Sequence, residues 1–201
     1  MITLMTFAAC DTQPSHSPYC VKAMCLLEMA GQKWRREDLK MPSKAPLGKL
    51  PVLRVGDRLI PDTEFIQHWL EEQGADFHVG LDAVQRAHSH GIVRMVEGSI
   101  GLAQAHDRWL RDDNWEVFRE LFFGDIPALI RGPITKRIRK GVRNGLMAQG
   151  IARFSESDRL LRVGADFNAI QTTLGDKPFL FGDAPTLADA ATVPVFDSPP
   201  T

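Results

Sequence analysis

The chain has 201 residues, of which 44% are apolar and 24% are charged, so it can bury the core of one large globular domain or two small ones. Its formal net charge of -1 excludes a strong global field of the kind that attracts nucleic acid, and we expect no nucleic-acid partner. The three cysteines, Cys10, Cys20 and Cys25, are too few for a disulfide framework, which favours a reducing compartment. Because no apolar stretch approaches the roughly 18 residues of a membrane span, we expect a cytoplasmic protein without a transmembrane segment.

Residues 1–77 alternate between strand and helix patterns. Ser17 and Pro18 precede an apolar run, and Gly31 follows it; these residue types are typical of the start and end of a helix. Because the run is nearly uncharged, we expect this helix to be largely buried on a sheet. Strands are expected at residues 2–7, 33–39, 52–55 and 58–60, and helices at residues 19–30 and 63–73. The first two strands are joined by a helix and should be parallel, whereas Gly56-Asp57 predicts a hairpin between the last two.

Strand patterns end after Gly80, and the rest of the chain is predicted to be helical. Helices are expected at residues 81–110, 115–123, 128–147 and 156–174, and from Leu187 onward. The fourth carries apolar side chains and a glycine on one face, namely Leu160, Gly164, Phe167, Ile170 and Leu174. Thr186 and Asp189 form a capping-box pattern, which we assign to folding rather than chemistry, and Pro194 should keep the last helix short.

Two predicted helix starts and one strand start are suited to a small peptide ligand. Ser17-Pro18-Tyr19-Cys20 enters the first helix, where unpaired N–H groups and the helix dipole favour an anion or a thiolate. For Ser17 alone, a simple N-cap is the alternative interpretation. Leu50-Pro51 precedes an apolar strand, where exposed backbone would offer an N–H and a C=O to a peptide. Asp62-Thr63 opens the next helix and forms a second anion site.

These segments, taken together, resemble the glutathione transferase N-terminal domain. The resemblance rests on Ser17-Pro18-Tyr19-Cys20, Leu27-Glu28-Met29-Ala30-Gly31, Pro46-Leu47-Gly48-Lys49-Leu50-Pro51 and Ile60-Pro61-Asp62-Thr63-Glu64-Phe65-Ile66. It implies an α/β thioredoxin-like domain at residues 1–77, followed by an all-α glutathione-transferase C-terminal domain at residues 78–201 that is short at its end.

The resemblance also implies a role for each site residue. Ser17 would be the catalytic residue, and Leu50 and Pro51 would supply a cis-proline turn whose backbone pairs with the cysteinyl part of glutathione. Asp62 and Thr63 would hold the γ-glutamyl end, with Thr in place of the usual Ser, which keeps the hydroxyl and adds a methyl group. Lys49 is assigned to the same binding site. Glutathione is then a co-substrate, no metal is required, and a homodimer is expected, as is usual among relatives.

Further segments resemble the branch that contains metaxins and the failed-axon-connections protein. They are Arg108-Trp109, Gln149-Gly150-Ile151-Ala152-Arg153-Phe154-Ser155, Leu174-Gly175-Asp176-Lys177 and Gly182-Asp183-Ala184-Pro185-Thr186-Leu187-Ala188-Asp189. Animal members of that branch are known as transport or developmental proteins, so two functions stay open. The first is conjugation of the glutathione thiolate to a small apolar electrophile, as in detoxification. The alternative is a non-catalytic interaction or scaffolding module.

Ser17-Pro18-Tyr19-Cys20 also resembles the glutaredoxin Cys-Pro-Tyr-Cys motif with its first Cys replaced by Ser. The nucleophilic Cys of that family is missing, which argues against dithiol redox chemistry, and Cys20 and Cys25 are expected in the core. His88 and His90 are two residues apart on a predicted helix, so they do not face one another and predict no metal site.

Three regions carry alternatives that the sequence leaves open. The stretch from Arg131 to Arg143 is a basic amphipathic helix, which is either a solvated face or a surface for an anionic membrane or acidic partner. A group of three aromatic residues either flanks a possible second-substrate pocket or belongs to the core. Its members are Trp109, Trp115 and Phe118. Near the C-terminus, a partly exposed apolar patch is expected at Val193, Val195 and Phe196. Either a partner subunit covers this patch, or the patch lowers the stability of the protein.

Overall fold

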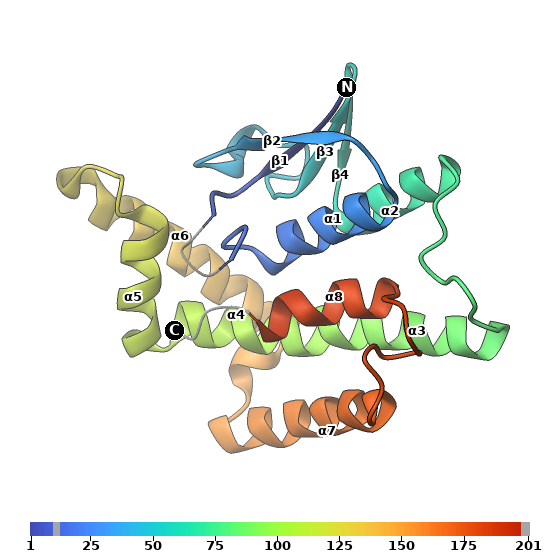
Figure 1. Cartoon of the computed structure of the whole chain (residues 1–201). Helices are drawn as coiled ribbons and strands as arrows, with labels where there is room; N and C mark the ends of the chain where they lie inside the picture. Colours follow the sequence, from blue (N-terminus) through green and yellow to red (C-terminus); the bar gives the residue numbers. More distant parts are fainter. Residues whose placement is uncertain (10–12, 198–201) are drawn as a thin grey trace. The chain divides into compact units, whose positions relative to one another are not determined.

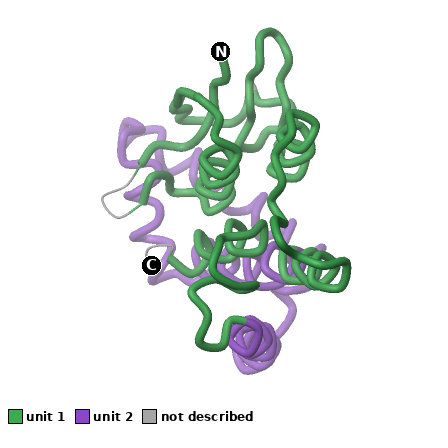
Figure 2. The backbone as a smooth tube through the Cα atoms, turned by 45° about the vertical axis from the view of Figure 1, so that its right-hand side comes forward, with its two compact units in different colours: residues 1–93, 174–199 green, residues 94–173, 200–201 purple. Residues whose placement is uncertain are grey.

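A computed structural model describes residues 1–9 and 13–197. The chain divides into two compact units, which Figure 2 distinguishes by colour. Unit 1 contains Met1–Val93 and Leu174–Pro199, and unit 2 contains Arg94–Thr173 with the last two residues. Cys10 lies outside the described residues. The predicted boundary between residues 77 and 78 stays a prediction.

Unit 1 is built on a four-stranded mixed sheet in the order β2-β1-β3-β4 (Figure 1). Its strands are β1 (Ile2–Thr6), β2 (Trp34–Asp38), β3 (Val52–Val55) and β4 (Arg58–Pro61). As predicted, β1 and β2 are parallel, and β3 and β4 form an antiparallel hairpin. The hairpin turn uses Gly56 at a φ of 59°, a left-handed conformation that glycine adopts without a steric penalty.

Helix α1 (Pro18–Met29) is the centre of unit 1. Four of its side chains, Cys20, Ala23, Leu26 and Leu27, are fully buried, because α1 is apolar almost all round. The sheet lies on one side of α1 and α8 (Leu187–Phe196) on the other, and α2 (Thr63–Glu72) also packs against α1 (Figure 1). Cys20 therefore lies in the core, as expected, and Cys25 is partly buried. A short 3-10 helix, η1 (Pro42–Lys44), precedes the Leu50-Pro51 turn.

The single helix predicted at residues 81–110 is wrong in detail. It begins at Ala83 as α3 (Ala83–Met95), passes through the π-turn η2 (Val96–Ile100), and continues as α4 (Gly101–Leu110). Gly98 and Ser99 lie inside the π-turn, where an extra residue is accommodated within the helical ladder. The segments on both sides keep helical spacing, and the stretch carries no strand pattern, so the sequence predicted one continuous α-helix.

Unit 2 consists of α4, α5 (Asp112–Phe123), α6 (Ala128–Gln149), the short η3 (Ile151–Arg153) and α7 (Glu156–Leu174). An aromatic cluster fills the space near α5 and consists of Trp109, Trp115, Phe118, Phe122 and Phe123. Trp115 and Phe118 are 6% and 4% exposed, so these two rings belong to the core. Among the described residues, no helix is both long enough and apolar enough to cross a membrane.

The apolar residues that spacing places on one face of α7 differ widely in exposure. Of the residues in α7, Ile170 alone is buried, whereas Leu160 and Phe167 are 65% and 40% exposed. Spacing places these residues on one face, but it does not say whether another element covers that face.

The C-terminal apolar patch is confirmed in part. Val193 and Phe196 are 57% and 48% exposed, whereas Val195 is buried, so its inclusion was wrong. Val195 lies seven residues after the buried Ala188 and shares its face of α8. Pro194 does not stop the helix, which continues through it to Phe196. Whether a partner subunit covers Val193 and Phe196 stays a prediction.

Asp189 anchors the start of α8 through a buried carboxylate. Its Oδ2 accepts hydrogen bonds from the Thr186 N–H and hydroxyl, both at 2.8 Å, which is the predicted capping box. Its Oδ1 accepts from the Leu180 N–H at 2.8 Å. One side chain therefore satisfies backbone donors from two segments and fixes the loop that precedes α8.

We predict that Asp189→Ala lowers the free energy of unfolding by about 2–4 kcal/mol, because buried N–H donors lose their acceptor along with the helix cap. Urea denaturation measures this change. The control is Asp176→Ala, which removes an exposed carboxylate and should change stability by less than about 0.5 kcal/mol. Equal losses in the two variants would contradict the anchoring role.

Candidate functional site

A cavity of about 230 Å³ in unit 1 brings the predicted binding residues together. Its lining consists of Tyr19, Leu47, Lys49, Leu50, Pro51, Pro61, Asp62 and Thr63. All five predicted substrate-binding residues are in this set. Ser17, the predicted catalytic residue, is not in the lining, although Tyr19, two positions later on α1, is.

The Leu50-Pro51 peptide bond is cis, as the family resemblance implied. The Leu50 side chain is 7% exposed and packs in a cluster with Cys20, Ala45 and Val52. Neither the N–H nor the carbonyl of Leu50 takes part in a backbone hydrogen bond within the described residues. The side chain therefore anchors the turn in the core, while the backbone polar groups are available to a ligand at the cavity.

Asp62 is the N-cap of α2 and has an unusual backbone conformation. Its Oδ1 accepts a hydrogen bond from the Glu64 N–H at 2.9 Å, and the Asp62 N–H donates to the Pro51 carbonyl at 3.3 Å. Its φ of 70° with ψ of 144° is rarely adopted by residues other than glycine. Such conformations cost about 1–3 kcal/mol and are concentrated at functional sites.

Thr63 follows Asp62 in the first turn of α2. The residue is 3% exposed, yet its hydroxyl has no hydrogen-bond partner in the part of the chain that the structure describes. The first N–H groups of a helix carry positive partial charge. A hydroxyl, a carboxylate and a helix N-terminus thus meet at one end of the cavity, an arrangement that can hold both charges of an amino acid.

Ser17 belongs to a group of small polar side chains beneath the start of α1. It is the N-cap of α1, but its hydroxyl makes no capping hydrogen bond. Burial raises the pKa of the Cys20 thiol, and hydrogen bonds from Thr6, the Phe7 backbone, Ser17 and Ser15 oppose part of that rise. The Ser17 hydroxyl thus contacts a buried, protonated thiol, which is not set up for redox chemistry.

Arg36 on β2 holds the loop that leads into α1, and sequence reasoning missed it. Its two terminal nitrogens donate to the carbonyls of Pro14 (2.5 Å) and Phe7 (2.9 Å), and its Nε pairs with Asp38 at 2.5 Å. No local motif identifies such a contact, because the carbonyls lie more than twenty residues away in sequence. Tyr19 was also missed as a cavity residue, although it belongs to the motif that indicated Ser17.

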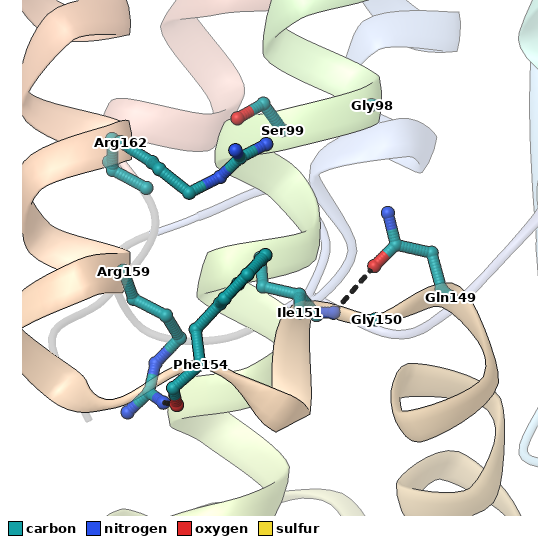
Figure 3. Close-up of a pocket in the computed structure, with 9 residues that line it drawn as sticks. Gly98, Ser99, Gln149, Gly150, Ile151, Phe154, Arg159 and Arg162 are labelled. Atoms are coloured by element: carbon teal, nitrogen blue, oxygen red, sulfur yellow. Dashed lines mark hydrogen bonds between the residues drawn. The ribbon is translucent and has the colours of Figure 1, made fainter.

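A second, smaller cavity of about 120 Å³ lies in unit 2 (Figure 3). Arg162 lies over the ring of Phe154 at 5.0 Å, and Arg159 donates to the Phe154 carbonyl at 2.6 Å. The Ile151 N–H donates to the Gln149 side chain at 3.0 Å. These contacts fix the turn between α6 and α7, which accounts for both arginines structurally. Within the described residues, no group of three or more His, Cys, Asp or Glu side chains could hold a metal ion.

Comparison with protein families gives two matches along the chain. The profile of the glutathione S-transferase N-terminal domain matches residues 18–114, and that of the glutathione S-transferase C-terminal domain matches residues 163–192. The chain belongs to the glutathione transferase superfamily. The matched N-terminal segment contains every residue that lines the cavity in unit 1.

Individual relatives agree with this family and with its predicted branch. The chain is 28% identical to isoprene-epoxide–glutathione S-transferase from Rhodococcus sp. (strain AD45), over 95% of this chain and 83% of that protein. It is also 28% identical to Failed axon connections from Drosophila melanogaster, over 94% of this chain but only 48% of that protein. The crystal structure of glutathione transferase GSTFuA3 from Phanerochaete chrysosporium has the same fold, with a TM-score of 0.60 at 19% identity, covering 98% of this chain and 83% of that one.

Two substitutions at Asp62 separate the effect of its strained backbone on stability from the effect of its helix cap. Asp62→Ala keeps the unfavourable φ and loses the cap, so it should lower the free energy of unfolding by about 1 kcal/mol. Asp62→Gly relieves the strain and replaces the cap at a cost of only a few tenths of a kcal/mol, so it should be at least as stable as wild type. Urea midpoints at unchanged m-value measure both effects. If the two variants are equally unstable, Asp62 is not strained.

Proposed function

We propose that the protein binds glutathione in the unit 1 cavity and transfers its thiolate to a small apolar electrophile. The observation that carries the proposal is that Lys49, Leu50, Pro51, Asp62 and Thr63, chosen from the sequence, line one cavity. Glutathione is the co-substrate that members of this superfamily use, and the lining offers a complementary group for each of its polar parts.

The γ-glutamyl end of glutathione carries an ammonium and a carboxylate. In this proposal the Asp62 carboxylate pairs with the ammonium through the oxygen that does not cap α2. The Thr63 hydroxyl and the N-terminus of α2 bind the carboxylate. The Leu50 N–H and C=O pair with the cysteinyl backbone, in the way an edge strand pairs with a peptide. Lys49, which is exposed, is available to the carboxylate of the glycyl end.

The glutathione sulfur then lies near the N-terminus of α1. There the helix dipole and the Ser17 hydroxyl stabilise the thiolate over the thiol. For this to happen, the Ser17 hydroxyl must donate to the glutathione sulfur instead of Cys20, which needs only a rotation about its side chain. The thiolate attacks a carbon of the electrophile and forms a C–S bond. With an epoxide, the ring C–O bond at that carbon breaks, and the oxygen leaves as an alkoxide that takes up a proton from water. An epoxide is a candidate class, because one relative is named for an isoprene epoxide.

The second candidate is a non-catalytic module that keeps the glutathione site. Two observations favour it: Ser17 does not line the cavity, and Failed axon connections is as similar in identity as the transferase. The chain spans about half the length of that relative. Conjugation assays on a panel of epoxides, aromatic halides and unsaturated carbonyls separate the candidates. Glutathione binding without turnover of any electrophile would favour the module.

For binding, we predict that Thr63→Ala weakens glutathione affinity by about ten- to a hundredfold, because one hydrogen bond to a charged group is worth about 1.5–3 kcal/mol. Thr63→Ser keeps the hydroxyl and is the matched control, with affinity within about threefold of wild type. Isothermal titration calorimetry measures both. Unchanged affinity in Thr63→Ala would rule out this residue as the γ-glutamyl contact.

For catalysis, we predict that Ser17→Ala slows conjugation by about a hundred- to a thousandfold, since a positioned donor to a developing anion is lost. Glutathione affinity should change little, and the pKa of bound glutathione should rise. Ser17→Cys should instead gain glutathione mixed-disulfide reduction, because a thiol at a helix N-terminus has a lowered pKa. Both variants are compared with wild type in conjugation and thiol-transfer assays. Equal conjugation by Ser17→Ala and wild type would reduce Ser17 to a helix-start residue.

A further inference from the structure

The charge of unit 2 is strongly segregated along the sequence. Between residues 128 and 155 there are seven basic residues and no acidic one, and six of the basic residues belong to α6. The whole chain is nearly neutral, at -1. Helix α6 has 22 residues and is therefore about 33 Å long, so its cations form an extended surface rather than a point.

Two of these six cations hold α6 in place. Arg131 pairs with Glu120 at 2.7 Å and donates to the Ile126 carbonyl at 2.9 Å. Arg139 pairs with Asp112 at 2.7 Å, donates to the Trp109 carbonyl at 2.7 Å, and lies over the Trp115 ring at 5.0 Å. Thr135 and Leu146 are buried on the same side of the helix. These contacts determine which face of α6 points away from α4 and α5.

The opposite face carries the other four cations, which are Lys136, Arg137, Lys140 and Arg143. All four are exposed, and none takes part in an ion pair with another described residue. Structural pairing therefore does not account for them, whereas it does account for Arg131 and Arg139. This difference divides the basic stretch into an inner, structural pair and an outer, unpaired group.

The outer face also carries exposed apolar side chains at both ends. Leu129 is 94% exposed and Met147 is 38% exposed. Along the chain, Leu129, Lys136, Lys140, Arg143 and Met147 are spaced by seven, four, three and four residues, which places them in one stripe about 27 Å long. Ile130, 51% exposed, adds to the apolar end next to Leu129. We call the five spaced residues, Leu129, Lys136, Lys140, Arg143 and Met147, the basic stripe.

We propose that the basic stripe docks α6 flat on an anionic phospholipid bilayer. Such a surface offers phosphate-bearing headgroups to the cations and an apolar layer just below them to Leu129 and Met147. A nucleic acid would pair with the cations and leave both apolar ends in water. An acidic protein would need a groove matched to cations and apolar ends together, whereas a bilayer presents both layers at every point. The basic stripe is separate from the glutathione cavity, which lies in unit 1.

The experiment is co-sedimentation of the full chain with vesicles of phosphatidylcholine, with and without one third phosphatidylserine. We expect binding to the anionic vesicles alone, weakened by salt. Lys136→Gln with Lys140→Gln should reduce the partition coefficient by about 25-fold, because each cation near such a surface contributes about fivefold. The matched control is Lys33→Gln with Arg35→Gln, which removes two exposed cations of unit 1, one just before β2 and one within it, and should leave binding within about twofold.

A second variant tests the apolar part. Leu129→Ser should retain binding at low salt and lose it at higher salt, where the electrostatic attraction is screened. Circular dichroism confirms that each variant keeps its helix. The proposal is overturned if wild type does not bind anionic vesicles at low salt, or if the control pair loses as much binding as the stripe pair. It is also overturned if duplex DNA competes the protein off the vesicles at equal phosphate concentration.

Discussion

Helix α1 is apolar on nearly every side, and unit 1 depends on covering it. Leu26 and Leu27 are fully buried, so neither the sheet alone nor α2 alone could shield the helix from water. The missing cover comes from α8, which lies more than 150 residues later in the chain. The segment that carries α8 must therefore return to the N-terminal segment, and this is why unit 1 contains two stretches that are far apart in the chain. The same packing fixes the start of α1, and with it Tyr19, which lines the cavity together with the Leu50-Pro51 turn.

The elements whose ends depend on neighbouring residues in the sequence could be predicted from it. Ser17 and Pro18 at the start of α1, Gly56 in the hairpin and the Thr186–Asp189 capping box each act within a few residues, so a linear pattern is sufficient. The π-turn at residues 96–100 was not predicted, because it interrupts the helical spacing at one point only and the segments on both sides still have helical patterns. The open face of α7 was not predicted either. Its exposure depends on which other elements reach it, and no local pattern carries that information.

The residues of the candidate site also divide into those that local motifs indicate and those that depend on distant parts of the chain. Leu50, Pro51, Asp62 and Thr63 were identified because they belong to short motifs shared with a family, and they line one cavity. Arg36 was not identified, because its partners are carbonyls, which every residue has. The direction of the Ser17 hydroxyl was also beyond the sequence. A residue type determines which hydrogen bonds are possible, whereas its rotamer depends on neighbours such as Thr6 and Cys20.

The position of the two motif residues, Ser17 and Cys20, bears on the kind of chemistry that the scaffold can support. A dithiol enzyme needs an exposed, easily ionised thiol in the first position, and here an oxygen stands there. The remaining thiol is fully buried, and its burial disfavours the charged form. The start of α1 therefore combines the positive end of a helix dipole, which favours an anion, with a thiol whose burial disfavours its charged form. Such an arrangement suits a thiol that arrives with a ligand.

The concentration of cations on α6 has a consequence for the molecule in solution. Six of the chain's 24 basic residues are on this helix, so the remaining 18 share the rest of the sequence with all 25 acidic residues. The sequence pI of about 6.6 is thus an average over two regions of opposite sign. On ion-exchange resins the protein responds to its local surface, and above its pI it can still be retained by a cation exchanger through α6.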